Sequence, residues 1–158
     1  MVLEDVPVTI RNIYDRVRVG EPDYVDMMIP PEKAYDICRD TSSVILVDNS
    51  RTLSTEAPYL LDVTSKIVVI DHHRIGKDFV ENPMLTYLEP YASSACELVT
   101  EIIYYMFEKI DLDKLIAESL LAGIVVDTKN FYYQTGVRTF EMASYLKRFG
   151  ADSIAVKQ

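Results

Sequence analysis

The sequence predicts an α/β fold, a three-layer sandwich around a mainly parallel β-sheet. Three observations support this class: short apolar runs rich in β-branched residues, longer segments whose apolar residues recur at helical spacing, and alternation of the two along 158 residues. With 49% hydrophobic and 26% charged residues, the chain has the composition of an ordinary soluble domain. We therefore expect a single domain over residues 1–158.

Three short segments are predicted to be strands. "SVILVD" (43–48) and "KIVVID" (66–71) are nearly continuous apolar runs, which is typical of strands buried on both faces of a parallel sheet. "MLTYLEP" (84–90) alternates between apolar and polar residues and ends at proline. Between the first two strands, "STEAPYLLD" (54–62) is expected to form a short helical connector.

Helical spacing predicts helices on either side of these strands. A capping box of Ser94 and Glu97 marks the start of one helix, Asp111 or Asp113 can cap the next, and Gly150 is expected to end the last at its C′ position. The predicted helices are "VTIRNIYDRV" (8–17), "PPEKAYDICRD" (30–40), "SSACELVTEIIYYMFEKI" (93–110), "DLDKLIAESLLAGIVVDTKNF" (111–131) and "GVRTFEMASYLKRFG" (136–150).

Charge and composition exclude several classes of protein. The net charge of −9 argues against binding duplex nucleic acid, which requires clustered Lys and Arg to neutralise phosphates. Cys38 and Cys96 lack metal-site spacing and are expected to be packed thiols of a reducing compartment. No apolar run approaches the ~20 residues of a membrane span, and the first residues do not resemble a signal peptide. We expect a cytoplasmic location.

Three apolar runs end in aspartate: "VILVD" at Asp48, "IVVID" at Asp71 and "GIVVD" at Asp127. The carboxyl ends of parallel strands meet at one edge of a sheet, so these carboxylates are expected to converge on one crevice. The third run can instead be the end of a helix, which would still deliver an acid from a buried element. The simpler alternative is that each aspartate only caps the following helix or turn.

Both histidines of the chain, His72 and His73, directly follow Asp71. Imidazole and carboxylate ligands together suit Mn²⁺, Fe²⁺ or Zn²⁺, and several aspartates favour Mn²⁺ or Mg²⁺. Two such ions could activate a water molecule and hold a phosphoryl group. A solvated turn or a buried core histidine is the alternative, and the flanking acids favour the metal site.

"IDHHR", "EPYASS" and "AGIVVDTKNF" together resemble the DHH-family phosphoesterases, and within that family the cyclic-di-AMP phosphodiesterases of the GdpP type. The similarity is dense over residues 43–153. The resemblance implies hydrolysis of cyclic-di-AMP to linear pApA by two Mn²⁺ ions, with Mg²⁺ or Co²⁺ as alternative metals. It also implies a full-length protein anchored to the membrane, with its catalytic domain in the cytoplasm.

The resemblance further implies a role for each residue of the predicted metal site. Asp48 would be a metal-bridging carboxylate, and His72 and Asp127 would be further metal ligands. His73 would face the substrate phosphate, and Asp71 would orient the histidines.

Three further residues are candidates for substrate binding. Ser93 and Ser94 lie at a helix start, where hydroxyl and N–H groups can bind an anion, although an ordinary N-cap is the commoner role. Arg138 is a weaker candidate for a phosphate contact, because an arginine in a first helical turn is more often only solvated.

The chain departs from the family pattern in two places. The first family motif, His-x-x-x-Asp-x-Asp, is absent because both histidines belong to the triplet, and "DLD" (111–113) opens a helix in the wrong part of the chain. The glycine-rich loop of the C-terminal substrate domain is absent too. We therefore expect a truncated DHH domain that binds metal weakly and is weakly active or inactive in isolation.

Alternative functions remain open. A related DHH enzyme could act as a nanoRNase that also dephosphorylates pAp, as a RecJ-like exonuclease, or as a family II pyrophosphatase. The acidic charge disfavours the exonuclease, and "EPYASS" with "VVDTKNF" disfavours the pyrophosphatase. The chain could also be a non-catalytic folding or interaction module. An exposed sheet edge would favour association into homodimers.

Overall fold

A computed structural model describes residues 1–2, 11–20 and 22–154. It divides into two compact units, residues 1–69 with 76–86 and residues 70–75 with 87–158. The described residues combine helices with one three-stranded sheet, which confirms the α/β class. The helices are α1 (Arg11–Gly20), α2 (Pro22–Asp26), α3 (Pro31–Ile37), α4 (Ala95–Met106), α5 (Lys114–Asp127) and α6 (Val137–Arg148), and the strands are β1 (Val44–Val47), β2 (Ile67–Asp71) and β3 (Leu85–Leu88).

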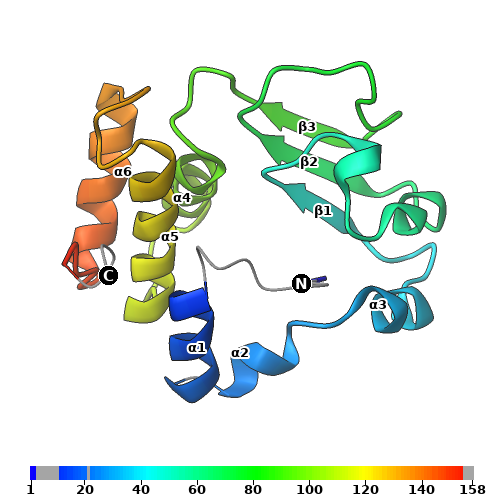
Figure 1. Ribbon diagram of the computed structural model, residues 1–158, viewed down its shortest axis with the longest axis horizontal. Coiled ribbons are helices and arrows are strands. Elements are labelled where there is room, and N and C mark those ends of the chain that lie inside the picture. Colours follow the sequence, from blue (N-terminus) through cyan, green and yellow to red (C-terminus); the bar gives the residue numbers. More distant parts are fainter. Residues whose placement is uncertain (3–10, 21, 155–158) are drawn as a thin grey trace. The chain divides into compact units, whose positions relative to one another are not determined.

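The strands form one sheet in the order β1-β2-β3. Met84 N donates to Ile67 O at 2.7 Å, and Glu89 N donates to Asp71 O at 3.0 Å. The pairing therefore advances in the same direction along β2 and β3, and all three strands point the same way in Figure 1. The predicted parallel sheet is confirmed, and the carboxyl ends of its strands share one edge.

The two apolar strands differ in burial. Every residue of β2 is buried or partly buried, as predicted. In β1 only Leu46 is buried, whereas Ile45 is 58% and Val47 is 47% exposed. The prediction that β1 is covered on both faces is therefore wrong. Ile45 and Val47 alternate with the buried Leu46, so they share one face of β1, and that face lacks a covering layer among the described residues.

The first unit contains two small apolar clusters. One lies on the sheet, and the other lies where α3 packs on the 3₁₀ helix η3 (Pro58–Asp62). The expected connector is η3 together with a second 3₁₀ turn, η2 (Thr52–Ser54). The helix predicted over 8–17 is α1 from Arg11 onward, and its first residues lie outside the described part of the chain. The buried residues are Leu46, Ile67, Val69 and Val80 in one cluster and Ala34, Ala57 and Leu60 in the other.

The second unit is built on α4, α5 and α6, which pack against one another. Its core is the apolar face shared by α5 and α6, with Leu121, Ile124 and Leu146 almost completely buried. Helices α4 and α5 approach closely at Gly123, where an added Cβ would lie 2.2 Å from Cys96 Sγ. Any larger residue at position 123 would require Cys96 to move.

The predicted helix caps are present. Asp113 Oδ1 accepts from Leu115 N at 2.7 Å, Ser94 caps α4, and Gly150 follows α6 with φ +83°. Helix α4 ends at Met106, four residues earlier than predicted. No helix in the described ranges has the length and apolar character that a membrane crossing requires.

Candidate metal centre

Asp48 follows β1 in a left-handed conformation, with φ 63°. Aspartate is one of the few residues besides glycine that adopt this conformation readily, because its short side chain can bond to nearby backbone groups. The turn ends the strand at Val47 and leaves the Asp48 side chain exposed. The predicted carboxylate is thus presented at the carboxyl end of β1.

Asp71, the last residue of β2, is fully buried and organises the two histidines. Its Oδ1 accepts from His72 N at 2.8 Å, from His73 N at 3.2 Å and from His73 Nδ1 at 2.7 Å. A carboxylate oxygen accepts only, so His73 Nδ1 carries the proton. His73 Nε2 therefore keeps its lone pair, which is the tautomer that a metal-binding histidine needs.

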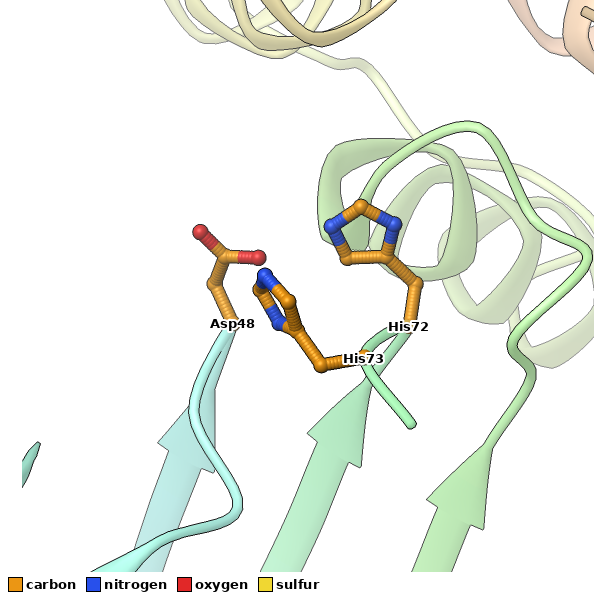
Figure 2. A group of neighbouring side chains, drawn as sticks. All are labelled: Asp48, His72 and His73. Carbon is orange, nitrogen blue, oxygen red and sulfur yellow. The ribbon is translucent and has the colours of Figure 1, made fainter. Parts of the chain in front are cut away.

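Asp48, His72 and His73 form a metal-capable group at the ends of neighbouring strands. Each offers one ligand atom, and the three atoms lie within 4.8 Å of one another (Figure 2). One carboxylate and two imidazoles suit a divalent transition metal such as Mn²⁺. The fixed tautomer of His73 supports the same conclusion. The residues present therefore fit a metal ion.

Asp127 lies beside His72. This residue ends α5, so the third aspartate run is the end of a helix, and its Oδ2 lies 3.8 Å from His72 Nε2. Thr128 fixes the helix end, because its buried hydroxyl donates to Ile124 O at 2.6 Å and accepts from Phe131 N at 2.9 Å. His73, which we expected to face the substrate phosphate, lies in the metal-capable group; its role toward phosphate stays a prediction.

Ser93 and Ser94 are buried, and their hydroxyls have partners within the chain. Ser94 Oγ accepts from Glu97 N at 3.0 Å, as an N-cap does. Ser93 Oγ donates to Glu97 Oε2 at 2.6 Å. The capping role is confirmed for Ser94, and anion binding by either serine stays a prediction.

Glu97 has a role that the sequence did not reveal. The reciprocal capping box would bring its side chain to Ser94 N, but its Oε2 instead accepts from Ser93 N at 3.2 Å, Ser93 Oγ at 2.6 Å and Thr139 Oγ1 at 2.7 Å. Because Thr139 is in the first turn of α6, this buried carboxylate joins α4 to α6. Two glutamates one turn apart on a mostly apolar helix, Glu97 and Glu101, are the signal that could have identified the contact.

Arg138 also contacts α4. Its Nε donates to Glu101 Oε1 at 2.7 Å, its terminal nitrogen donates to Glu101 Oε2, and Tyr87 OH donates to the same Oε2 at 2.9 Å. Arg138 and Tyr87 hold the pKa of Glu101 below its usual value, and Glu101 raises the pKa of Arg138 further above its ordinary range. Burial, with Glu101, raises the pKa of Tyr87. The guanidinium predicted to bind phosphate is engaged with a carboxylate.

The family model described as DHH family, N-terminal domain, matches residues 6–124. The chain belongs to the DHH family. The predicted family membership is confirmed, and the metal-capable group contains the two histidines of the family triplet.

The chain is similar to several curated proteins that carry different names. The chain is 45% identical over 130 residues to "Cyclic-di-AMP phosphodiesterase GdpP" of Bacillus subtilis. The matched region covers 82% of this chain and 20% of that protein. It is 36% identical over 130 residues to "Membrane protein-large ribosomal subunit bL9 fusion protein" of Onion yellows phytoplasma, a match that covers 82% of this chain and 15% of that protein. It is 34% identical over 113 residues to "Probable manganese-dependent inorganic pyrophosphatase" of Thermotoga maritima, a match that covers 70% of this chain and 20% of that protein. The chain spans between 15% and 20% of the length of these relatives.

A solved structure has the same fold. It is an exopolyphosphatase-related protein from Bacteroides fragilis, which superposes with a TM-score of 0.75 at 20% identity and covers 98% of this chain and 44% of that chain. At this identity the likeness concerns the fold alone. It supports the α/β architecture of the DHH chain.

Proposed function

We propose that the full-length protein is a metal-dependent phosphodiesterase that hydrolyses cyclic-di-AMP to linear pApA. The observation that carries this proposal is the 45% identity to a cyclic-di-AMP phosphodiesterase, against 34% to the manganese-dependent pyrophosphatase. The chain then contributes a DHH domain over residues 1–158. In isolation we expect it to be weakly active or inactive.

The metal centre has an identifiable set of protein ligands. Asp48, His72 and His73 would hold one divalent ion, and Asp127 would contribute from beside His72. Mn²⁺ is the expected metal, with Mg²⁺ or Co²⁺ as alternatives, and two ions are expected in the complete centre. When bound, such ions polarise a phosphoryl oxygen and make a water molecule more acidic.

The protein's own residues prepare the centre for this chemistry. Asp71 keeps the proton on His73 Nδ1 and fixes the backbone of both histidines. The His73 imidazole is therefore oriented before metal or substrate arrives, which lowers the cost of reorganisation. The further candidates for substrate contact are His73, Ser93, Ser94 and Arg138.

Several properties of the full-length protein belong to the same proposal. We expect its substrate to be a cyclic dinucleotide or a short oligonucleotide, not duplex nucleic acid. We expect the catalytic domain to lie in the cytoplasm and the parent protein to be membrane-anchored, in line with the name of the phytoplasma relative. Association into homodimers is expected through the exposed face of β1.

Calorimetry with Mn²⁺ tests the metal centre in this chain. The unsubstituted chain should bind Mn²⁺, and His72→Ala should abolish measurable binding, whereas Glu141→Ala, which removes an exposed carboxylate from α6, should not. If neither the unsubstituted chain nor the variant binds, the chain is a non-catalytic module.

A substrate panel on the full-length protein tests the reaction. Cyclic-di-AMP should be hydrolysed faster than pApA, pAp, short RNA or inorganic pyrophosphate. Preference for pApA or short RNA would identify a nanoRNase instead, and preference for pyrophosphate would identify the activity named for the Thermotoga relative.

A further inference from the structure

Two tyrosine side chains in the second unit are almost completely exposed. Tyr91 is 92% exposed and Tyr132 is 90% exposed. A tyrosine ring is usually half-buried or more, because its apolar surface is large. A ring this exposed is open to stacking by a ligand, and its position relative to the metal centre is therefore informative.

Gln134 joins the two loops that carry these rings. Its Nε2 donates to Pro90 O at 3.0 Å and to Ala92 O at 3.1 Å, the two carbonyls on either side of Tyr91. Tyr132 is only two residues before Gln134 along the chain. The two exposed rings are thus carried by neighbouring, directly bonded loops.

The loop that carries Tyr132 is held by backbone hydrogen bonds and a pair of stacked rings. Thr128 O accepts from Tyr132 N at 2.9 Å and from Tyr133 N at 2.8 Å, and the Phe131 ring stacks on Phe140 with 5.5 Å between ring centres. Left-handed backbone occurs at Lys129, Asn130, Phe131 and Gln134. A ring on such a loop loses little conformational entropy when a ligand binds.

One loop begins at a residue of the candidate metal centre, and the other begins at a residue bonded to Asp71. Asp127 immediately precedes the loop of Tyr132, and its carboxylate lies beside His72. The loop of Tyr91 begins at Glu89, whose N–H donates to Asp71 O at 3.0 Å. Each ring is therefore carried by a loop that starts close to the residues proposed to act on the phosphate.

We propose that Tyr91 and Tyr132 form a stacking site for a base of the nucleotide substrate. This inference rests on the proposed phosphodiesterase function and adds a contact for the base to the contacts for the phosphate. Stacking on aromatic rings suits an acidic protein, because it binds nucleotides without a strongly positive surface. Lys129, whose Nζ lies 5.9 Å from the ring centre of Tyr133, adds a positive charge to the same loop.

The test measures binding of pApA and of inorganic phosphate to the Mn²⁺-loaded chain by calorimetry. Tyr91→Ala and Tyr132→Ala should each weaken pApA binding roughly tenfold, because stacking of one base on one ring is lost. The phenylalanine variants at both positions should bind pApA like the unsubstituted chain. Affinity for Mn²⁺ and for inorganic phosphate should be unchanged in all four variants.

A matched control uses an exposed tyrosine elsewhere. Tyr105, 76% exposed near the end of α4, packs against Tyr104, and Tyr105→Ala should leave pApA binding unchanged. Unchanged pApA binding in both alanine variants, with Mn²⁺ binding intact, would overturn the stacking site and leave the proposed function standing. Absence of Mn²⁺ binding in the unsubstituted chain would overturn the metal centre proposed for this chain and this inference with it, and the substrate panel on the full-length protein tests the reaction separately.

Discussion

Acidic side chains occupy two contrasting regions of this molecule. In the candidate metal centre, Asp48 and Asp127 are exposed and lie near imidazole nitrogens. In the contact between α4 and α6, Glu97 and Glu101 are buried and accept hydrogen bonds from several donors of the chain. A carboxylate supplied with donors by its own fold stabilises that fold, whereas an exposed carboxylate beside imidazoles can bind a cation from solution.

Glu97→Ala is expected to have the largest effect. It leaves the Ser93 and Thr139 donors buried without their acceptor, which should lower the free energy of unfolding by about 3 kcal/mol. Urea denaturation monitored by circular dichroism measures the loss. Glu141→Ala on the exposed face of α6 is the control and should change stability by less than about 0.5 kcal/mol. Equal stability of the two variants would show that the buried contact contributes little.

His72→Ala should affect metal binding and not stability, the reverse of Glu97→Ala. Removing a ligand is expected to weaken Mn²⁺ binding by about a hundredfold or more, since even indirect partners of metal ligands contribute 10–100-fold. Stability without metal should hardly change. Electron paramagnetic resonance of free Mn²⁺ measures the affinity, and a variant that retained full affinity would exclude His72 from the centre.

Asp71→Asn should have a smaller effect on the same centre. The amide can still accept from the backbone N–H groups but is a weaker acceptor for His73 Nδ1, so the preferred tautomer of His73 loses support. We expect Mn²⁺ affinity to fall about tenfold. The ring-nitrogen resonances of His73 in ¹⁵N NMR report the tautomer directly, and an unaltered tautomer with unaltered affinity would contradict this role.

Acid should weaken the α4–α6 contact gradually. The pKa of Glu101 is lowered in the folded protein, chiefly by its hydrogen bonds with Arg138, so its ionised form contributes stability above the unfolded-state pKa near 4.5. This contribution is lost as pH falls through the lower folded-state pKa. Unfolding measured between pH 7 and pH 3 should depend less on pH in Glu101→Gln, and parallel curves would refute the assignment.

The sequence predicted the secondary structure well because its local signals agree with one another. The apolar runs became β1 and β2, and Asp113, Ser94 and Gly150 occupy the caps expected of them. Burial of β1 was predicted wrongly, because an apolar run does not reveal whether both faces of a strand are covered. Helix α4 ended early for a comparable reason, since tertiary packing decides where an amphipathic pattern stops.

The metal-capable group was predictable to the level of its residues, because aspartates after strands and a pair of histidines are visible in the sequence. Which of these residues come together was not predictable. That His73, in addition to His72, joins Asp48 depends on the turn made by Asp71. The link from Glu97 to Thr139 spans 42 residues, and no local pattern indicates such a pairing.

The left-handed backbone at Asp48 restricts which substitutions this position accepts. Glycine and asparagine can adopt the conformation, so they would preserve the turn while removing the charge. Glutamate keeps the charge but lacks the short side chain that makes the turn inexpensive. In a library of all substitutions at position 48, we therefore expect several residue types to allow folding. We expect aspartate alone to support metal-dependent function.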